Sequence, residues 1–338
     1  MKKITIREIA SEAGVSIGTV SNVLHKRQIV SKESAEKVNA VISKYNYRMN
    51  ISASILRRKI SKMIGIIVPD NTNMVYSYIS KAIELSASAK GYNVVICNSN
   101  YDYHNDIEHI GMLISRNIDG IIIAPTLEKK EVVQGLIDAK IPAVLFNRRI
   151  EGIKADCVMS DGYNAIKGAV DYLARLGHKK IGYIGREKTL WHSEFRYKGF
   201  IDGLKDNKLD FYKEFVINDE GFNFSYYDGY SDMEKFLNMK EKPTAFLVFN
   251  DVLAIGAIKA IKDYKFKVPD DFSIIGFDNI MVDDFIDPPL TSITHQKSDM
   301  ASAAFEMLFE RMYENSIEQR CVYIPLSLKI RNSTRVIA

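Results

Sequence analysis

Polar and aromatic side chains follow several short apolar runs of this sequence. Arg196, Asp278 and Asn250 combine a cation, a carboxylate and an amide, which is a donor and acceptor set suited to a hydroxyl-rich ligand. Aromatic rings among them can stack on the C–H face of a sugar or on a flat base. We therefore predict a site that binds a small molecule, made of Asn73, Tyr76, Asn147, Arg148, Trp191, Ser193, Arg196, Phe224, Asn250 and Asp278.

The apolar runs themselves predict the fold that positions these side chains. After residue 63 they alternate with amphipathic stretches of helical length, and they lie at 64–68, 93–97, 120–123, 142–146, 180–185, 244–249 and 272–277. This alternation is typical of doubly wound α/β units with buried parallel strands. Two sets of units predict two lobes, and ligands in such folds bind beyond the carboxyl ends of the strands.

Some of these residues also have a structural interpretation. Arg196 and Asp278 could form an ion pair across the cleft between the lobes, and Trp191 could cover the edge of a lobe. Asp251, which follows Asn250, is better explained as the cap of the next helix than as a ligand contact.

Length and composition limit the class of protein. A chain of 338 residues is long enough for two or three domains. No apolar run reaches the roughly 18 residues that a membrane span requires. Cys97, Cys157 and Cys321 lie far apart without a CxxC spacing, which favours a reducing compartment and argues against disulfides or a zinc site. We expect a cytoplasmic protein without membrane contact, metal or cofactor.

The sequence lacks the motifs of the enzymes that use an α/β architecture. It contains no GxxxxGK[ST], GxSxG or HExxH motif, and no GxGxxG follows a predicted strand. We therefore expect a binding protein rather than an enzyme.

The charge of the chain is unevenly distributed. Residues 1–62 contain 13 Lys and Arg against 4 Asp and Glu, a net charge of +9, whereas the remainder has a net charge of −5. A small basic module joined to a mildly acidic body is typical of a nucleic-acid-binding protein. The alternative, a solvated basic tail, would not need the helical periodicity of this segment.

Helix signals divide the basic module into three short helices. Thr5 and Glu8 form a capping box, and Gly14 suits the left-handed end of the first helix. Ser16 caps a second helix, and a third begins after Ser31. A helix pair with a short turn that contains Gly predicts a helix-turn-helix, whose second helix enters the major groove of DNA.

The stretch TIREIASEAGVSIGTVSNVLH closely resembles the N-terminus of the LacI/GalR family of bacterial transcription regulators. The resemblance implies that Ile17, Gly18 and Asn22 occupy the positions that read bases. Asn22 can pair with adenine and Ile17 can pack on a thymine methyl group, whereas Gly18 has no side chain for this purpose. It also implies backbone contacts by Thr5, Ser16, Thr19, Ser21, His25 and Tyr47.

Residues 47–59 resemble the hinge segment of that family, which folds to a helix on the operator. Ala53 and Leu56 match the family pattern, whereas Met49 replaces its Pro and Ser54 replaces its Arg. The resemblance implies minor-groove contacts by Ala53, Leu56 and Arg57, with Leu56 as the wedge that kinks the duplex. A plain basic linker is the alternative for this segment.

The resemblance extends over the body, through motifs such as IIGFDN and PLTSITHQ. It implies a two-lobed body similar to type I periplasmic sugar-binding proteins. We expect a helix-turn-helix domain at 1–48, a hinge at 49–62 and an effector-binding and dimerisation domain at 63–338. The first lobe would comprise 63–160 and 291–321, and the second 161–290 and 322–338.

The family further implies a homodimer on a pseudo-palindromic operator in double-stranded DNA, switched by a small molecule between the lobes. We expect a repressor of carbohydrate-use genes with a sugar as its effector. A purine, a nucleoside or another metabolite is an alternative effector. A soluble sugar-binding protein without a role on DNA is an alternative of a different class, but it would not need the basic module.

Asn22→Ala tests the assignment of the second helix. Loss of the amide should lower operator affinity and relax the preference at one base position, because Asn pairs with adenine through two hydrogen bonds. The measurement is a binding titration against operator variants that differ at single positions. An equal loss of affinity on all sequences would refute the base-reading role.

Overall fold

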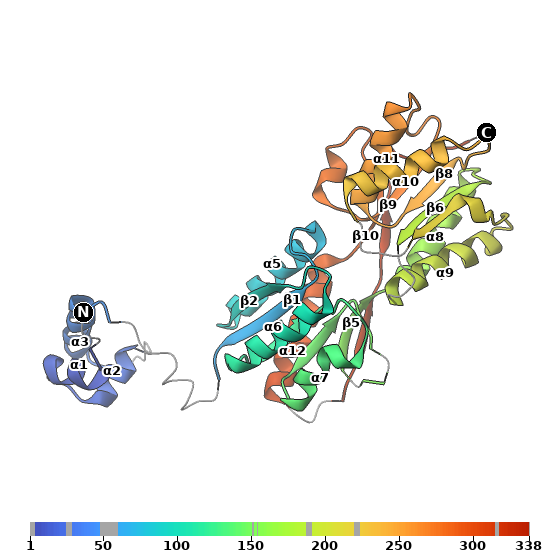
Figure 1. Cartoon of the computed structure of the whole chain (residues 1–338). Helices are drawn as coiled ribbons and strands as arrows, with labels where there is room; N and C mark the ends of the chain where they lie inside the picture. The colour runs from blue at the N-terminus through green and yellow to red at the C-terminus, as the bar shows by residue number, and fades with distance from the viewer. Residues whose placement is uncertain are drawn as a thin grey trace. The chain divides into compact units, whose positions relative to one another are not determined.

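The computed structural model describes residues 4–24, 29–47, 60–150, 152–153, 155–186, 191–219, 224–314 and 318–337, without the side chains of residues 191 and 192. The chain divides into two compact units, Met1–Ser61 and Lys62–Ala338 (Figure 1). Four predicted DNA-contact residues, His25, Ala53, Leu56 and Arg57, lie outside the described residues.

The first unit consists of the helices α1 (Ile6–Ala13), α2 (Ile17–Leu24) and α3 (Lys32–Lys44). The predicted capping box of Thr5 and Glu8 is confirmed, since the Thr5 N–H donates to Glu8 Oε2 at 2.6 Å and the Glu8 N–H donates to Thr5 Oγ1 at 3.3 Å. Gly14 ends α1 with a φ of 65°, a left-handed conformation that favours glycine. Buried side chains from all three helices form one small core: Ile9, Ala10, Ala13, Val20, Val38 and Val41.

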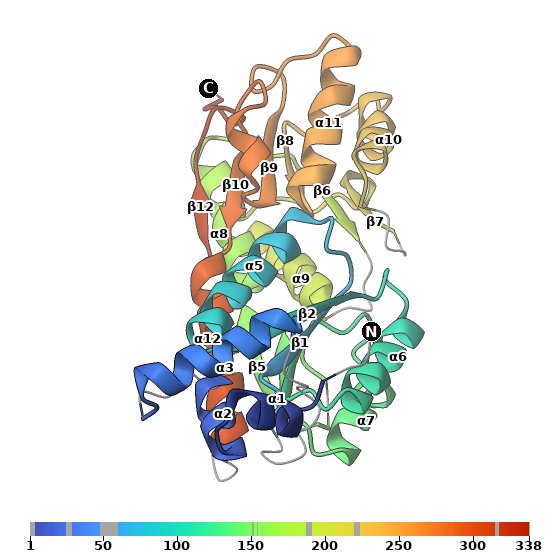
Figure 2. The ribbon, with the colours of Figure 1, turned by 90° about the vertical axis from the view of Figure 1, so that its left-hand side faces the viewer.

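The second unit contains two six-stranded sheets, one in each lobe (Figures 1 and 2). The first sheet has the order β11-β5-β4-β3-β1-β2, with the bounds β1 Met63–Val68, β2 Asn93–Asn98, β3 Gly120–Ile123, β4 Ala143–Phe146, β5 Asp156–Ser160 and β11 Cys321–Ile324. The second has the order β12-β10-β9-β8-β6-β7, with the bounds β6 Ile181–Arg186, β7 Val216–Asp219, β8 Ala245–Val248, β9 Ser273–Asp278, β10 Thr291–Thr294 and β12 Ser327–Lys329. All pairings are parallel except that of β10 with β12.

Helices cover both faces of each sheet, which confirms the predicted doubly wound α/β body. In the first lobe α5 (Met74–Ala89) and α12 (Lys297–Tyr313) pack on one face, and α6 (Tyr103–Ser115) and α7 (Lys130–Asp138) pack on the other. In the second lobe α10 (Tyr226–Leu237) and α11 (Asp251–Asp263) cover one face, and α8 (Gly162–Arg175) and α9 (Trp191–Asp206) cover the other. Short 3₁₀ helices lie at Lys213–Phe215 and Met281–Asp284.

The chain crosses between the lobes three times, but two crossings lie later than predicted. Residues 291–294 form β10 and pair with β9 in the second sheet, not in the first lobe as expected. Residues 322–324 belong to β11 and pair with β5 in the first sheet, not in the second lobe. In both places the chain completes a strand in one sheet before it crosses, so the lobe boundary falls at the carboxyl end of that strand.

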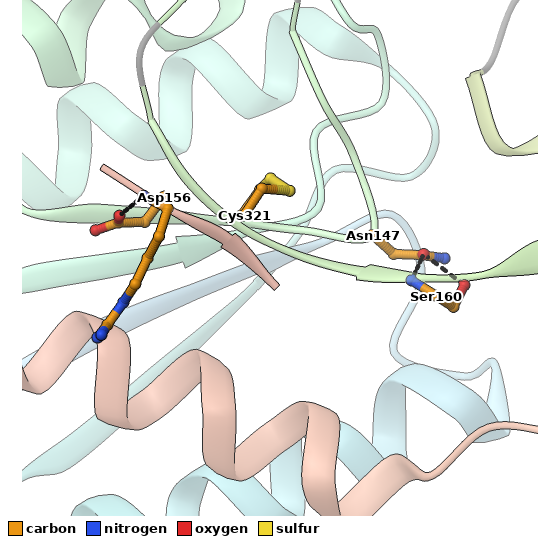
Figure 3. Close-up of a disulfide and its surroundings, with 6 residues drawn as sticks. Asn147, Asp156, Ser160 and Cys321 are labelled. Atoms are coloured by element: carbon orange, nitrogen blue, oxygen red, sulfur yellow. Dashed lines mark hydrogen bonds between the residues drawn. A yellow bond between two sulfur atoms is a disulfide. The ribbon is translucent and has the colours of Figure 1, made fainter. Parts of the chain in front are cut away.

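A disulfide joins Cys157 and Cys321, so the expectation of a chain without disulfides is wrong. The two residues are 164 positions apart in sequence, but β5 and β11 place them directly opposite each other with Cα atoms 4.5 Å apart (Figure 3). Sequence spacing could not reveal this pair, because it depends on the register of two strands from distant segments. Cys97 is a buried free cysteine.

The described residues meet the requirements of neither a membrane-spanning helix nor a metal site. Within the described ranges, no helix is long and apolar enough to cross a membrane. In the same part of the chain, no group of three or more His, Cys, Asp or Glu residues could hold a metal ion.

Gly256→Ala tests the packing of α10 on α11. A Cβ atom at Gly256 would overlap with the backbone of Tyr226, so the two helices would have to separate. We expect the free energy of unfolding to fall by about 1–3 kcal/mol, measured by urea denaturation.

Gly168→Ala is the matched control. Gly168 is exposed in α8, and a Cβ atom added there would meet no other atom within 4 Å. This change should stabilise the protein by up to about 1 kcal/mol, because alanine favours the helix. Equal effects of the two changes would contradict the close crossing of α10 and α11.

Candidate functional site

A cavity lies between the lobes, at the carboxyl ends of strands from both sheets. Its volume is about 70 Å³, less than the roughly 300 Å³ at the lower end for small-molecule sites. Eight of the ten predicted effector residues line it: Asn73, Tyr76, Asn147, Arg148, Arg196, Phe224, Asn250 and Asp278. Ligand entry therefore requires the lobes or the lining side chains to move.

Two predicted residues do not belong to this lining. Ser193 is buried in α9, and its hydroxyl oxygen has no hydrogen-bond partner. The side chain of Trp191 lies outside the described residues. Seven further residues line the cavity and were not predicted from the sequence: Val75, Ile79, Tyr101, Phe146, Phe249, His295 and Met300.

Two asparagines of the cavity are helix caps. Asn73 Oδ1 accepts a hydrogen bond from the Val75 N–H, and Asn250 Oδ1 accepts one from the Leu253 N–H, each at 2.9 Å. Because the caps use the amide oxygens, the NH₂ groups are the remaining donors of these side chains, and the Asn73 side chain also forms a hydrogen bond with the Tyr101 hydroxyl. The positive ends of α5 and α11 also favour electronegative ligand atoms at this place.

The predicted cap at Asp251 is therefore wrong by one residue. Asp251 is the first residue of α11 and is completely buried. Its carboxylate accepts hydrogen bonds from Ser292 Oγ at 2.7 Å and from the Ile280 N–H at 3.1 Å. Asp251 therefore links the segment that follows β9 to β10 through hydrogen bonds.

Asn147 and Arg148 form the wall contributed by the end of β4. Asn147 has a φ of 50°, and its Oδ1 accepts hydrogen bonds from the Ser160 N–H at 3.2 Å and Oγ at 2.8 Å (Figure 3). Arg148 Nε donates to the Pro125 carbonyl at 3.1 Å. These bonds fix the wall to the ends of the neighbouring strands.

Arg196 places a buried positive charge beside the cavity. The residue is 4% exposed, and its Nη1 donates to the Phe249 carbonyl at 3.0 Å. The guanidinium carbon lies 3.5 Å from the ring centroid of Phe277. Burial lowers the pKa of Arg196 and the Asp278 carboxylate opposes this change, but an arginine keeps its proton in proteins.

Asp278 and His295 form the acidic side of the site. His295 Nε2 lies 3.1 Å from Asp278 Oδ1. Burial lowers the pKa of His295 despite the nearby carboxylate, which favours a neutral ring with its proton on Nε2. Nδ1 is then an acceptor, and it is buried without a hydrogen-bond partner. Arg196 and Asp278 both belong to the second lobe, so they do not form an ion pair across the cleft.

Aromatic rings close the cavity. Phe224 stacks on Phe249 with ring centroids 5.5 Å apart and planes 21° apart. Tyr101 follows β2 in the first lobe, and the centroid of its ring lies 5.6 Å from that of Phe224 in the second lobe. This contact joins the lobes, and burial raises the pKa of the Tyr101 hydroxyl.

The predicted base-reading residues lie along one helix of the first unit. Ile17 is 47% exposed at the start of α2, and Gly18 is exposed beside it, whereas Asn22 is half-buried. Ser16 Oγ accepts a hydrogen bond from the Thr19 N–H at 3.0 Å, which confirms the cap of α2. Of the other predicted backbone contacts, Thr5 is exposed, Ser21 is half-buried, and Tyr47 packs partly against the core.

The chain is similar to known regulators along its length. The model of the lacI family of bacterial regulatory proteins matches residues 5–50, and a periplasmic-binding-protein-like domain matches residues 170–334. The HTH-type transcriptional repressor PurR of Mannheimia succiniciproducens is 32% identical over 336 residues, 99% of each chain. Catabolite control protein A of Priestia megaterium is 30% identical over 334 residues, 98% of this chain and 99% of the relative.

Two solved structures are also similar. The lac repressor dimer bound to operator and the anti-inducer ONPF has a TM-score of 0.85 at 25% identity, and the match covers 99% of this chain and 100% of that one. A LacI family regulator from Enterococcus faecium with bound ribose has a TM-score of 0.74 at 25% identity, with 82% of this chain and 100% of that one covered.

Asp283→Asn tests the buried acidic pair behind the cavity. Asp283 is completely buried near Asp251, and burial raises its pKa to about 6. The folded protein therefore holds this proton at pH values where the unfolded chain has lost it, so stability falls as the pH rises from about 4 to about 6. The variant should become more stable than the parent chain as the pH rises through this window.

Urea denaturation at several pH values measures the effect, with the exposed Asp270→Asn as the control. If the difference between Asp283→Asn and the parent did not change with pH, the folded-state pKa of Asp283 would not be raised.

Proposed function

Because this chain belongs to the lacI family of bacterial regulatory proteins, we propose that it is a repressor that binds a pseudo-palindromic operator as a homodimer and responds to a small molecule between its lobes. It is a DNA-binding transcriptional regulator and not an enzyme. A dimer would place two copies of α2 on two half-sites about one helical turn apart. The similarity to a lac repressor dimer on its operator supports this arrangement.

The proposed effector is a sugar or a sugar derivative. The polar lining carries this proposal: Arg196 and the capping asparagines supply donors, and Asp278 and His295 Nδ1 supply acceptors around one small cavity. Each sugar hydroxyl both donates and accepts, so a ring of hydroxyls matches this mixed set. A related regulator of known structure binds ribose.

A purine is the second candidate effector. The aromatic rings of Tyr101, Phe224 and Phe249 form a wall on which a flat base could stack. Relatives named PurR, 30–34% identical to this chain, favour this candidate. The two candidate effectors differ in the number of hydrogen bonds that they form with the site. The edge of a base forms fewer hydrogen bonds than a ring of sugar hydroxyls, so a purine depends less on Asp278 as an acceptor.

The small cavity supports a switching mechanism. A ligand of sugar size must change the separation of the lobes, so it has different affinities for the open and closed arrangements. A ligand shifts such an equilibrium only by this difference in affinity. A coupling of about 1–3 kcal/mol between effector and operator is typical of allosteric proteins. We propose that the effector moves the first lobe and so changes the spacing between the two hinge segments, residues 49–62, of the homodimer.

The protein would act in the cytoplasm, where bacterial DNA is located.

Thermal unfolding against a panel of sugars, sugar phosphates and nucleobases tests the effector class. A ligand at 100 times its dissociation constant stabilises the folded protein by about 2.7 kcal/mol, which corresponds to a shift of roughly 5–10 °C. Asp278→Asn should abolish the shift, because it removes the carboxylate acceptor, whereas Asp270→Asn should keep it. A nucleobase hit would support the second candidate, and a panel without any hit would contradict both.

A further inference from the structure

The disulfide Cys157–Cys321 joins the two strands that lead to two of the three connections between the lobes, near the start of each strand. Cys157 lies in β5, and the chain passes from β5 through Asp161 into α8 of the second lobe. Cys321 begins β11, whose end leads directly to β12 of the second sheet. The bond therefore ties together two strands whose carboxyl ends act as the lobe connections.

Strand β11 depends on few other contacts. It is the edge strand of the first sheet and pairs with β5 alone. None of its four side chains is fully buried, and only Val322 and Ile324 pack against the core. At its start, the Arg320 N–H donates a hydrogen bond to the Asp156 carboxylate at 3.0 Å (Figure 3). Asp156 also accepts a hydrogen bond from Arg311 Nε at 2.9 Å. The disulfide adds a covalent link to this weakly buried contact.

The two sulfur positions differ in access to solvent. Cys321 is exposed, whereas Cys157 is 3% exposed. Both residues line an open cavity of about 360 Å³ that is separate from the effector cavity. Arg149 and Arg320 line this second cavity, with Glu318 as its acidic residue. Arg320 already pairs with Glu310 of α12, so Arg149 supplies the positive charge that favours the approach of an anionic thiol and stabilises the thiolate that the reaction needs.

We propose that Cys157 and Cys321 form a reversible modification site for an anionic low-molecular-weight thiol and its disulfide. The thiolate attacks the exposed Cys321 sulfur, the Cys157–Cys321 bond breaks, and Cys157 leaves as a thiolate that takes a proton from water. A second thiol then attacks the mixed disulfide and releases Cys321. One protein disulfide and two thiols thus give one protein dithiol and one small disulfide, and the reverse reaction restores the bond.

The same strand pair reaches the effector cavity. Ser160 ends β5 three residues after Cys157, and its N–H and hydroxyl hold the Oδ1 of Asn147, which lines that cavity. Figure 3 shows Asp156 and Ser160 on either side of the disulfide along the strand. Reduction loosens β11 and the position of β5, so it changes the ligand response. This second step rests on the proposed function.

The first experiment follows the thiols of the full chain in buffers of reduced and oxidised glutathione. Alkylation after acid quenching, read by mass spectrometry, should show one two-electron transition that involves residues 157 and 321 only. Cys321→Ser should abolish the transition, and Cys97→Ala should leave it unchanged. Cys321 is exposed, so its replacement does not disturb the core. Failure of the pair to oxidise at any glutathione ratio would overturn the site.

The second experiment compares the oxidised and reduced chain in effector binding and operator binding. We expect at least about a fivefold difference in one of the two dissociation constants, the lower end of ordinary allosteric coupling. Cys321→Ser should behave like the reduced chain in both buffers. Equal constants in both states, or a Cys321→Ser chain that still responds to glutathione, would overturn the coupling. A chain that binds no operator in either state would contradict the proposed function instead, and the thiol titration would still decide the modification site.

Discussion

The buried charge of Arg196 is the constraint on which the site depends. Burying a cation costs several kcal/mol unless other groups compensate for the lost water. Phe277 and Phe249 offset part of this cost through their ring faces, and the Phe249 carbonyl accepts one hydrogen bond. The Nε atom of Arg196 remains buried without a hydrogen-bond partner. A polar ligand in the cavity would complete the compensation, which explains why the surrounding groups are amides, a carboxylate and an imidazole rather than a purely apolar lining.

The path of the chain explains how binding at this charge can affect distant segments. Three crossings join the lobes, after β5, β10 and β11. The crossing after β10 begins at His295, which lines the cavity, and Ser160 at the end of β5 holds Asn147, which also lines it. The ends of β5 and β11 lie side by side, with the Cys157–Cys321 bond near their start and the Asn147–Ser160 contact at their end. Lobe movement must therefore bend the same short connections that position the cavity wall. We propose this shared use of the connections as the physical basis for a coupling between ligand, redox state and DNA affinity.

Much of this arrangement could be predicted from the sequence, and the rest depends on long-range pairing. Strands such as β1 and β8 are recognisable as continuous apolar runs because both of their faces are buried. Strands β11 and β12 lack such a run because their side chains are exposed or half-buried. The two displaced lobe boundaries follow β11 and β10, and β10 has the mixed sequence TSIT. Tyr101 follows an apolar run that was identified, so the rule of strand ends could have found it. His295 follows β10, whose mixed sequence gave no strand signal. The disulfide required the register of β5 and β11, which no local pattern contains.

The most direct test of the central claim is the operator dissociation constant of the full chain, measured across a titration with the identified effector. We expect a change of roughly 5–150-fold, and by linkage the operator must change effector affinity by the same factor. An effector that fills the inter-lobe cavity and leaves the operator dissociation constant unchanged would contradict the proposed coupling.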